Sequence, residues 1–159
     1  MPSEIQHLLE LQALQQLKAQ YCRYLDTKRW SDWLALFTND ATLCADNAPS
    51  GAGRDPETGP TYSGIKAIGD FVVPLFTGVE SVHQVHFPAI QLIGDTEASG
   101  IWGMEGIAQF PDGSFAHGYG HYHETYRKVD GQWRISTTHL TRLRVVTWSN
   151  QNGLIGAPR

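Results

Sequence analysis

The sequence predicts an α+β fold in which three helices precede and cover a curved antiparallel sheet. Apolar residues at helical spacing dominate up to about residue 76, with one strand-like segment among them. From residue 83 onward the pattern is strand-like, and turn signals separate the strands. Runs of strands that are segregated from helices are typical of α+β domains. A curved sheet wrapped on helices makes a cone, and the mouth of a cone suits a ligand.

Length and composition narrow the class of protein. The chain has 159 residues, which predicts one domain over residues 1–159 with an irregular tail from about residue 149. A net charge of −4 argues against a nucleic-acid partner. No apolar run approaches the roughly 20 residues of a membrane span, so no membrane partner is expected. The N-terminus lacks the order of a signal peptide, and we expect a cytoplasmic protein.

The two cysteines fit that compartment. Cys22 and Cys44 lie in apolar-patterned segments, where free buried thiols are the common state. Neither has the nearby histidine partner that a zinc site needs, so no metal is expected.

The first predicted helix begins at the capping residue Ser3 and ends at about Asp26. Serine is a favoured N-cap, and an acidic residue such as Glu4 is favourable in the first turn. The apolar positions that follow helical spacing are Ile5, Leu8, Leu9, Leu11, Leu14, Leu17, Tyr21, Tyr24 and Leu25.

The next elements are shorter. A second helix is predicted over Ser31–Phe37 and a strand over Ala41–Ala45. The segment Asp46–Pro60 is dense in Gly, Pro, Asp and Asn, which predicts a surface loop or pocket lid. A third helix is predicted over Ile65–Phe76, with Pro74 near its end, where proline kinks or shortens a helix.

Four strands joined as a meander complete the predicted fold. Turn signals at Gly94-Asp95, Pro111-Asp112-Gly113 and Asp130-Gly131 separate them. The strands are predicted over His83–Ile93, Ala98–Phe110, Phe115–Lys128 and Trp133–Trp148.

His83 is a candidate general base at the entry to the first of these strands. A carboxylate on one ring nitrogen would fix its tautomer and stabilise the imidazolium that forms on proton abstraction. Asp26, at the end of the first helix, is the candidate partner. Alternatively, His83 bonds a backbone carbonyl while Asp26 caps a turn or pairs with Arg29. A distant Asp and His seldom form a site, so the residues alone leave both interpretations open.

Five motifs follow one another along the chain. They are the tyrosine-rich segment that ends at Asp26, then WSDWLALFTNDA, YSG, VHQVHFPAIQLIGD and HETYRKVDGQWRI. Their order resembles the SnoaL-like proteins of the nuclear transport factor 2-like superfamily, next to scytalone dehydratase and hexachlorocyclohexane dehydrochlorinase. The resemblance covers about Ile5 to Val146.

This resemblance implies an Asp–His dyad. In that branch the aspartate ends the first long helix and the histidine stands at the entry to the strand after the third helix. These places hold Asp26 and His83 here, and Tyr24 or Tyr21 matches the active-site tyrosine of the dehydratase. The isomerase branch keeps its acidic groups on sheet strands, so an aspartate at the helix end favours the lyase branch.

The last strand departs from the dehydrochlorinase pattern. The position of that enzyme's arginine corresponds to Thr138 here, and Arg142 follows on the same face. The departure argues against a matching halide site. Both faces of this strand are mixed in polarity, so periodicity does not decide which one lines the pocket.

The other strands offer further ligand contacts. Tyr122 is interpreted as facing the pocket, because the alternation then turns the neighbouring histidines outward. His86, three residues after His83, is expected on the opposite face of its strand. Trp30 is a usual core residue, and Trp102 is the better pocket candidate. The expected substrate-binding residues are Tyr21, Tyr24, Trp30, Trp102, Tyr122, Thr138 and Arg142.

Together these expectations describe a cofactor-independent lyase that acts on a cyclic, hydrophobic small molecule. His83 would remove a proton from carbon, and Asp26 would orient and support it. An isomerase or polyketide cyclase with the same base is the first alternative. A non-catalytic ligand-binding or association module is the second. Members of the superfamily commonly associate through the outer sheet face, so the resemblance implies a homodimer or homotrimer.

Overall fold

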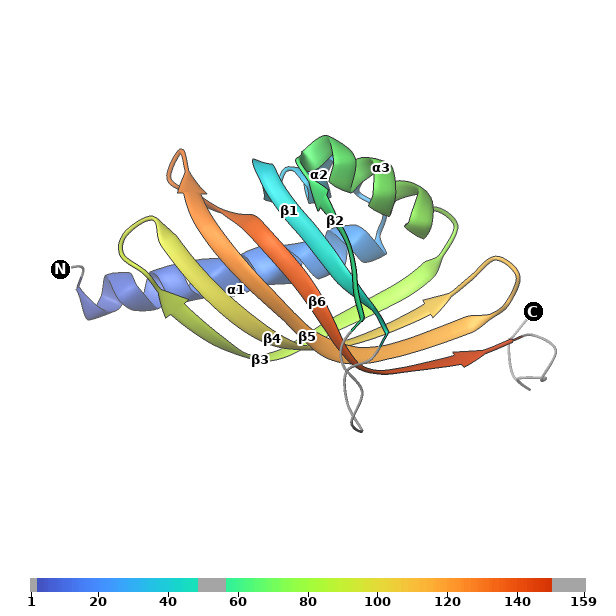
Figure 1. Cartoon of the computed structure of the whole chain (residues 1–159). Coiled ribbons are helices and arrows are strands. Elements are labelled where there is room, and N and C mark those ends of the chain that lie inside the picture. The colour runs from blue at the N-terminus through green and yellow to red at the C-terminus, as the bar shows by residue number, and fades with distance from the viewer. Residues whose placement is uncertain (1–2, 49–56, 150–159) are drawn as a thin grey trace.

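The computed structural model describes residues 3–48 and 57–149, and it consists of three helices packed against a six-stranded sheet (Figure 1). The sheet is strongly curved and does not close into a barrel. This confirms the predicted α+β cone. The helices are α1 (Glu4–Asp26), α2 (Trp30–Leu34) and α3 (Ile65–Phe76), and the strands are β1 (Phe37–Ala48), β2 (Glu57–Ser63), β3 (Glu80–Leu92), β4 (Glu97–Gln109), β5 (Phe115–Val129) and β6 (Gln132–Trp148).

The strands follow the order β2-β1-β6-β5-β4-β3. All neighbours are antiparallel except β1 and β6, which are parallel. The C-terminal four strands form the predicted meander, and the N-terminal pair is added along its β6 edge. Helix α1 lies against β3 and β6, while α3 covers β1 and β2 (Figure 1).

Helix α1 is built as its sequence predicts. The Ser3 side chain caps it by accepting a hydrogen bond from the Gln6 backbone N–H at 3.2 Å. Its buried stripe begins only at Leu14, whereas Ile5 and Leu8 near its N-terminus are largely exposed. The C-terminal half of the helix therefore faces the core, and this half carries Asp26.

The predicted second helix was too long. The structure ends α2 at Leu34, and Phe37 begins β1, where it pairs with Ile135 of β6. Phe37 is fully buried in an aromatic cluster with Tyr21 and Trp33. Tertiary packing therefore overrides the local helical pattern there.

Most of the described part of the predicted loop is strand instead. Asp46–Ala48 continue β1, and β2 begins at Glu57; residues 49–56 of the loop lie outside the described residues. Strand β2 stands at the sheet edge, where Pro60 is tolerated because it need not donate to a second neighbour. The predicted tail lies almost wholly outside the described residues as well.

The other predicted elements are confirmed. Helix α3 has the predicted bounds, and each strand of the meander agrees with its prediction to within three residues. The β5–β6 turn places Asp130 and Gly131 at φ values of 52° and 76°, as a type I′ hairpin turn requires. Gly120 is needed at a register shift, since a Cβ there would lie 1.9 Å from the Thr141 carbonyl oxygen.

Candidate active site

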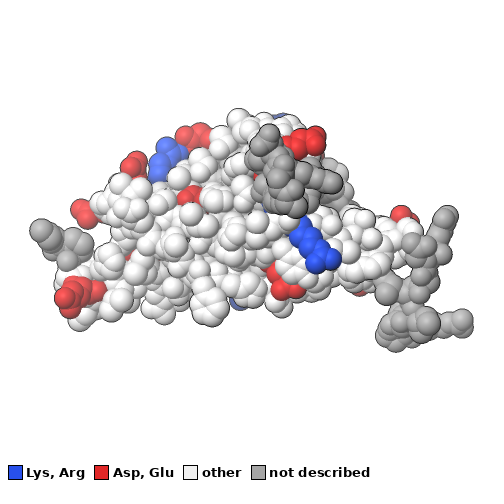
Figure 2. Space-filling model, turned by 60° about the horizontal axis from the view of Figure 1, so that its bottom comes forward, with Lys and Arg blue, Asp and Glu red and all other residues white. Residues whose placement is uncertain are grey.

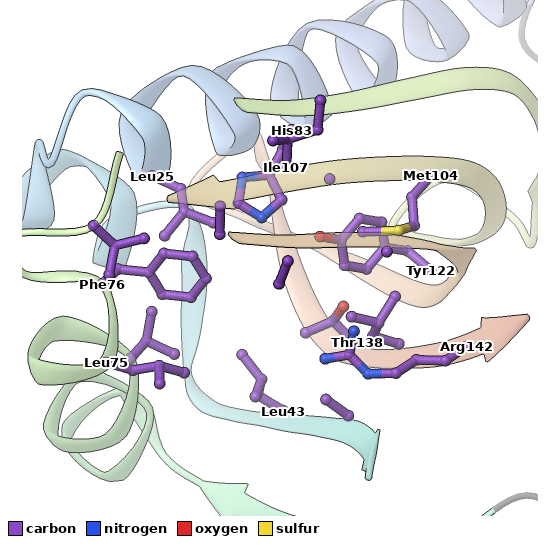
Figure 3. A pocket seen from close by; sticks show the side chains of 18 of the residues that line it. Leu25, Leu43, Leu75, Phe76, His83, Met104, Ile107, Tyr122, Thr138 and Arg142 are labelled. Atoms are coloured by element: carbon purple, nitrogen blue, oxygen red, sulfur yellow. The ribbon is translucent and has the colours of Figure 1, made fainter. Parts of the chain in front are cut away.

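A cavity of about 290 Å³ lies between the helices and the inner face of the sheet (Figure 3). Apolar side chains make up most of its wall, among them Leu25, Leu43, Val72, Phe76, Met104 and Leu140. The polar or ionisable side chains at its surface include Tyr21, His83, Tyr122, Thr138 and Arg142. An apolar enclosure with a few convergent polar groups is typical of small-molecule sites.

Asp26 and His83 meet at the edge of this cavity. Asp26 is the last residue of α1, and His83 lies near the start of β3. The His83 Nδ1 is 2.6 Å from Asp26 Oδ1, and the His83 backbone N–H donates to Asp26 Oδ2 at 2.7 Å. The two side chains are only 10% and 18% exposed, respectively. The carboxylate therefore holds both the ring and the backbone of the histidine.

The ring of His83 is oriented toward the cavity. His83 lines the cavity, and Gly106, which also lines it, leaves space for the imidazole: a Cβ there would lie 3.3 Å from His83 Cδ2. The Phe76 ring packs against the imidazole at a centroid distance of 5.7 Å. With Nδ1–H donated to the carboxylate, a neutral His83 keeps Nε2 unprotonated and able to accept a proton.

Two further residues support the carboxylate. The Ser81 hydroxyl donates to Asp26 Oδ1 at 2.9 Å, and the Lys28 ammonium donates to Ser81 Oγ at 3.0 Å. Burial lowers the pKa of Lys28, and the nearby Asp26 charge partly opposes this shift. Asp26 thus accepts three hydrogen bonds, so its orientation does not depend on the histidine alone.

Tyr21 and Tyr122 bring two phenols to the cavity. Their rings pack edge to face with centroids 5.7 Å apart. Burial raises the pKa of both phenols well above the usual value of 10, so they remain protonated and can donate hydrogen bonds. Burial also raises the pKa of the Cys22 thiol to about 11, which leaves it a poor nucleophile.

Three residues that the sequence nominated are absent from this wall: Tyr24, Trp30 and Trp102. The Tyr24 ring lies 4.5 Å from the Arg29 guanidinium. Trp30 packs against the outside of the core. Trp102 is buried, and its indole N–H donates to the Tyr126 hydroxyl at 2.7 Å.

Sequence reasoning missed a buried ion pair beneath the cavity. Lys18 Nζ lies 2.6 Å from Glu124 Oε1, and both side chains are completely buried. The positions of these two residues in the sequence are the signals that indicate their burial, although neither position identifies the partner. Lys18 falls between Leu14 and Tyr21 in the buried stripe of α1, and Glu124 shares its strand face with Tyr122.

Further histidines lie on the outer face of the sheet. His86 is exposed, on the face opposite His83 as predicted, and His117 pairs with Glu105 at 2.7 Å. Within residues 3–48 and 57–149, no group of three or more His, Cys, Asp or Glu side chains is placed to hold a metal ion. No helix in the described ranges has the length and apolarity to cross a membrane. On the face shown in Figure 2, charged side chains are scattered and form no basic patch.

Comparison with known proteins agrees with this architecture. The probable cyclase FGR4 of Gibberella zeae is 26% identical over 133 residues, which cover 82% of this chain and 89% of that protein. A candidate scytalone dehydratase of Novosphingobium aromaticivorans superposes with a TM-score of 0.78 at 21% identity, over 89% of both chains. The hexachlorocyclohexane dehydrochlorinase LinA-type3 of Novosphingobium barchaimii superposes with a TM-score of 0.75 at 17% identity, over 99% of this chain and all of that one.

These structural similarities show the shared fold, and the sequence itself shows the family. A model of the SnoaL-like domain matches residues 6–139, which span the elements from α1 to the middle of β6. The chain therefore belongs to the SnoaL-like domain family.

Proposed function

We propose that the protein is a small lyase of the dehydratase type, in which His83 removes a proton from carbon and Asp26 positions it. The observation that carries this proposal is the 2.6 Å contact between His83 Nδ1 and Asp26 Oδ1 at the wall of an apolar cavity. The similarity to a probable cyclase and to dehydratase and dehydrochlorinase structures supports lyase- or cyclase-type activity on a small molecule.

The geometry suits an elimination. His83 Nε2 takes the proton from a carbon next to a carbonyl, and Asp26 stabilises the resulting imidazolium. The electron pair of the C–H bond forms the new double bond as the C–O bond breaks. The imidazolium then returns its proton to the departing hydroxyl, which leaves as water. Tyr122 is a protonated donor in the same cavity and would polarise the carbonyl oxygen.

The size and polarity of the cavity support a particular class of substrate. Its volume of about 290 Å³ is at the lower end of the range for small-molecule sites. Its apolar wall favours a compact cyclic molecule with few polar groups. An enclosed apolar site also keeps water away from the base, which strengthens the interaction between the imidazolium and the carboxylate.

The similarity to the probable cyclase favours a second candidate activity, cyclisation or isomerisation with the same base. The two classes of reaction give different products. An elimination of water lowers the mass of the substrate by that of one water molecule, whereas an isomerisation leaves the mass unchanged. Mass spectrometry of the products distinguishes the two.

The test is a screen of cyclic β-hydroxy ketones, followed by enone absorbance. On an accepted substrate, His83→Ala should lower kcat by at least the 10²–10⁴-fold that a positioned base typically supplies. His86→Ala is the matched control, because this exposed histidine lies on the other face of the same strand. Equal turnover by wild type and His83→Ala would remove His83 as the base and favour a ligand-binding module.

We also propose that the outer sheet face associates into a homodimer or homotrimer. Exposed apolar side chains on three strands support this: Val82, Ile101 and Leu143 are each about half exposed. Light scattering at micromolar concentrations should give the mass of an oligomer. A monomer mass throughout that range would contradict the proposal.

A further inference from the structure

Thr138 lines the cavity, and a buried carboxylate determines the direction in which its hydroxyl can hydrogen-bond. Its Oγ1 lies 3.0 Å from Oε1 of the buried Glu124, and only 4% of the residue is exposed. A carboxylate that is paired with an ammonium group can only accept hydrogen bonds, so Thr138 must be the donor. A threonine hydroxyl has one proton. Toward the cavity, Thr138 can therefore only accept.

The buried network around Glu124 leaves no alternative arrangement. The other carboxylate oxygen, Oε2, accepts from the Tyr126 hydroxyl at 2.5 Å. The Trp102 indole can only donate, and it donates to the Tyr126 oxygen, so the phenol proton must point to Glu124. Burial also raises the pKa of Tyr126 well above its usual value, which keeps that proton in place.

Lys18 fixes the charge of this network and joins it to the cavity. Its ammonium group lies 2.6 Å from Glu124 Oε1, and 4.0 and 3.5 Å from the ring centroids of Tyr21 and Tyr122. Both tyrosines also line the cavity. An ammonium group has no acceptor, so it cannot reverse any of these hydrogen bonds.

The other polar groups of the cavity have different hydrogen-bonding directions. Arg142 and Tyr122 can donate to an oxygen of a ligand, while His83 Nε2 is the base. In Figure 3, His83 enters the cavity from one side and Thr138 and Arg142 lie toward another. A ligand that meets Thr138 with a carbonyl, ether or halogen would bring two acceptors together. A ligand that meets it with O–H or N–H would form a hydrogen bond.

We propose that Glu124 makes Thr138 an obligate hydrogen-bond acceptor, and that the substrate carries a hydroxyl or N–H group that donates to it. This inference rests on the proposed function in one respect, namely that the cavity is the substrate site. It names the class of substrate as a hydroxylated or amino-substituted ring compound. In this assignment Thr138 contacts the substrate, and Glu124 acts through Thr138 as a positioning residue.

The experiment compares two probes of nearly equal shape, 2-naphthol and 2-fluoronaphthalene. Only the naphthol can donate. We expect wild-type protein to bind 2-naphthol about tenfold more tightly by isothermal titration calorimetry, in line with one well-formed hydrogen bond. Thr138→Val keeps the shape without the hydroxyl and should bring the affinity ratio close to one. Thr138→Ser restores the hydroxyl and should restore the ratio.

Three results with the wild-type protein and the threonine variants would overturn the inference. The first is a wild-type ratio of one or less, and the second is an unchanged ratio in Thr138→Val. The third is the lack of saturable binding by either probe. Circular dichroism of both threonine variants establishes whether they are folded. If Thr138→Val fails to fold, Thr138→Ser still tests the inference.

Measuring the same ratio in His83→Ala separates this inference from the proposed function. The ratio should be retained there, because the hydroxyl is bound by Thr138. Its loss would mean that the probe donates to His83, which would overturn the inference. Conversely, a failed elimination assay with an intact binding ratio would refute the proposed reaction and leave the acceptor role of Thr138 standing.

Discussion

Among the carboxylate pairs that join α1 to the sheet, Lys18–Glu124 and Asp26–His83 differ in the hydrogen-bonding groups that they leave unused. Lys18–Glu124 and Asp26–His83 are both closed by a 2.6 Å contact and lie about two helical turns apart. The first pair is completely buried, and both oxygens of its carboxylate accept hydrogen bonds from protein groups. The second is partly exposed and leaves one ring nitrogen for the cavity. Spare hydrogen-bonding capacity next to a cavity, rather than the pairing itself, distinguishes the candidate catalytic pair from the structural one.

Breaking the buried pair should have the largest effect on folding. Lys18→Met leaves the Glu124 carboxylate buried without its counter-charge, which typically costs about 3–5 kcal/mol of unfolding free energy. The double variant Lys18→Met/Glu124→Leu should recover most of that loss. Urea denaturation measures the unfolding free energy of the single and the double variant.

Lys66→Met is the matched control for this experiment. The Lys66 ammonium pairs with Asp70 at 2.6 Å, but the pair lies at the surface of α3. The Lys66 side chain is 88% exposed and the Asp70 side chain is 66% exposed. Its loss should change the unfolding free energy by less than about 1 kcal/mol. A Lys18→Met protein as stable as wild type would contradict the expectation that the buried pair matters more for stability than the exposed Lys66–Asp70 pair.

The same kind of change at the other pair should affect turnover instead. Asp26→Asn removes the negative charge beside His83 and can hold the wrong tautomer, so kcat should fall on the order of 10²-fold or more. KM should change less, because the base acts mainly in the transition state. Urea midpoints measured in parallel should stay close to wild type. A joint loss of stability and activity would place Asp26 with the structural pair.

A smaller effect on turnover is expected from removing the hydrogen bond that Ser81 donates to Asp26. Ser81→Ala removes one of three hydrogen bonds to the carboxylate and the partner of the Lys28 ammonium. A hydrogen bond to a charged group contributes about 1.5–3 kcal/mol, so a fall of about tenfold in kcat/KM is expected. Ser31→Ala, an exposed serine on α2, should leave kcat/KM unchanged. Wild-type kcat/KM in Ser81→Ala would show that the serine does not position the carboxylate.

The smallest effect concerns a histidine without a carboxylate partner. Burial lowers the pKa of His123, with added repulsion from His139 and His121, while Asp46 opposes the shift. The His123 ring lies 3.1 Å from the Thr141 hydroxyl. Because the folded state binds this proton less tightly than the unfolded state, the contribution of His123 to stability falls as the pH drops below about 6.5.

His123→Gln should therefore lessen the fall in melting temperature between pH 7.5 and pH 5.5, by a few degrees at most. His7→Gln, at an exposed position near the start of α1, is the control and should melt like wild type at both values. A larger acid-induced fall in His123→Gln would give the wrong sign and refute the assignment.

The sequence allowed much of the fold to be predicted, because α3 and the meander have regular periodicity and glycine turns. Strand β2 was missed since Gly59 and Pro60 are typical of loops, and only its edge position makes them acceptable. The residues alone left the pairing of Asp26 with His83 open, and the resemblance to the SnoaL-like proteins is what implied it. The catalytic role of that pair stays a prediction.

The buried Lys18–Glu124 pair could not be predicted in the same way. Lys18 and Glu124 are 106 residues apart in the chain, and each alone is typical of a surface position. Only the packing of α1 on β5 shows that they neutralise one another. Trp102 was nominated for the cavity because it is a large aromatic residue near the middle of a strand. Its place in the core depends on Tyr126, which periodicity does not reveal.

The parallel pairing of β1 with β6 determines when the cavity can form. Asp46 and His139, which join these strands, are 93 residues apart. During synthesis at about 5–20 residues per second, β1 waits roughly 5–20 s for the strand that carries Thr138 and Arg142. The edge of β1 that pairs with β6 stays unpaired through that interval, and unpaired strand edges make incompletely folded chains vulnerable to aggregation. Strand β6 thus both completes the wall of the cavity and covers the edge of β1.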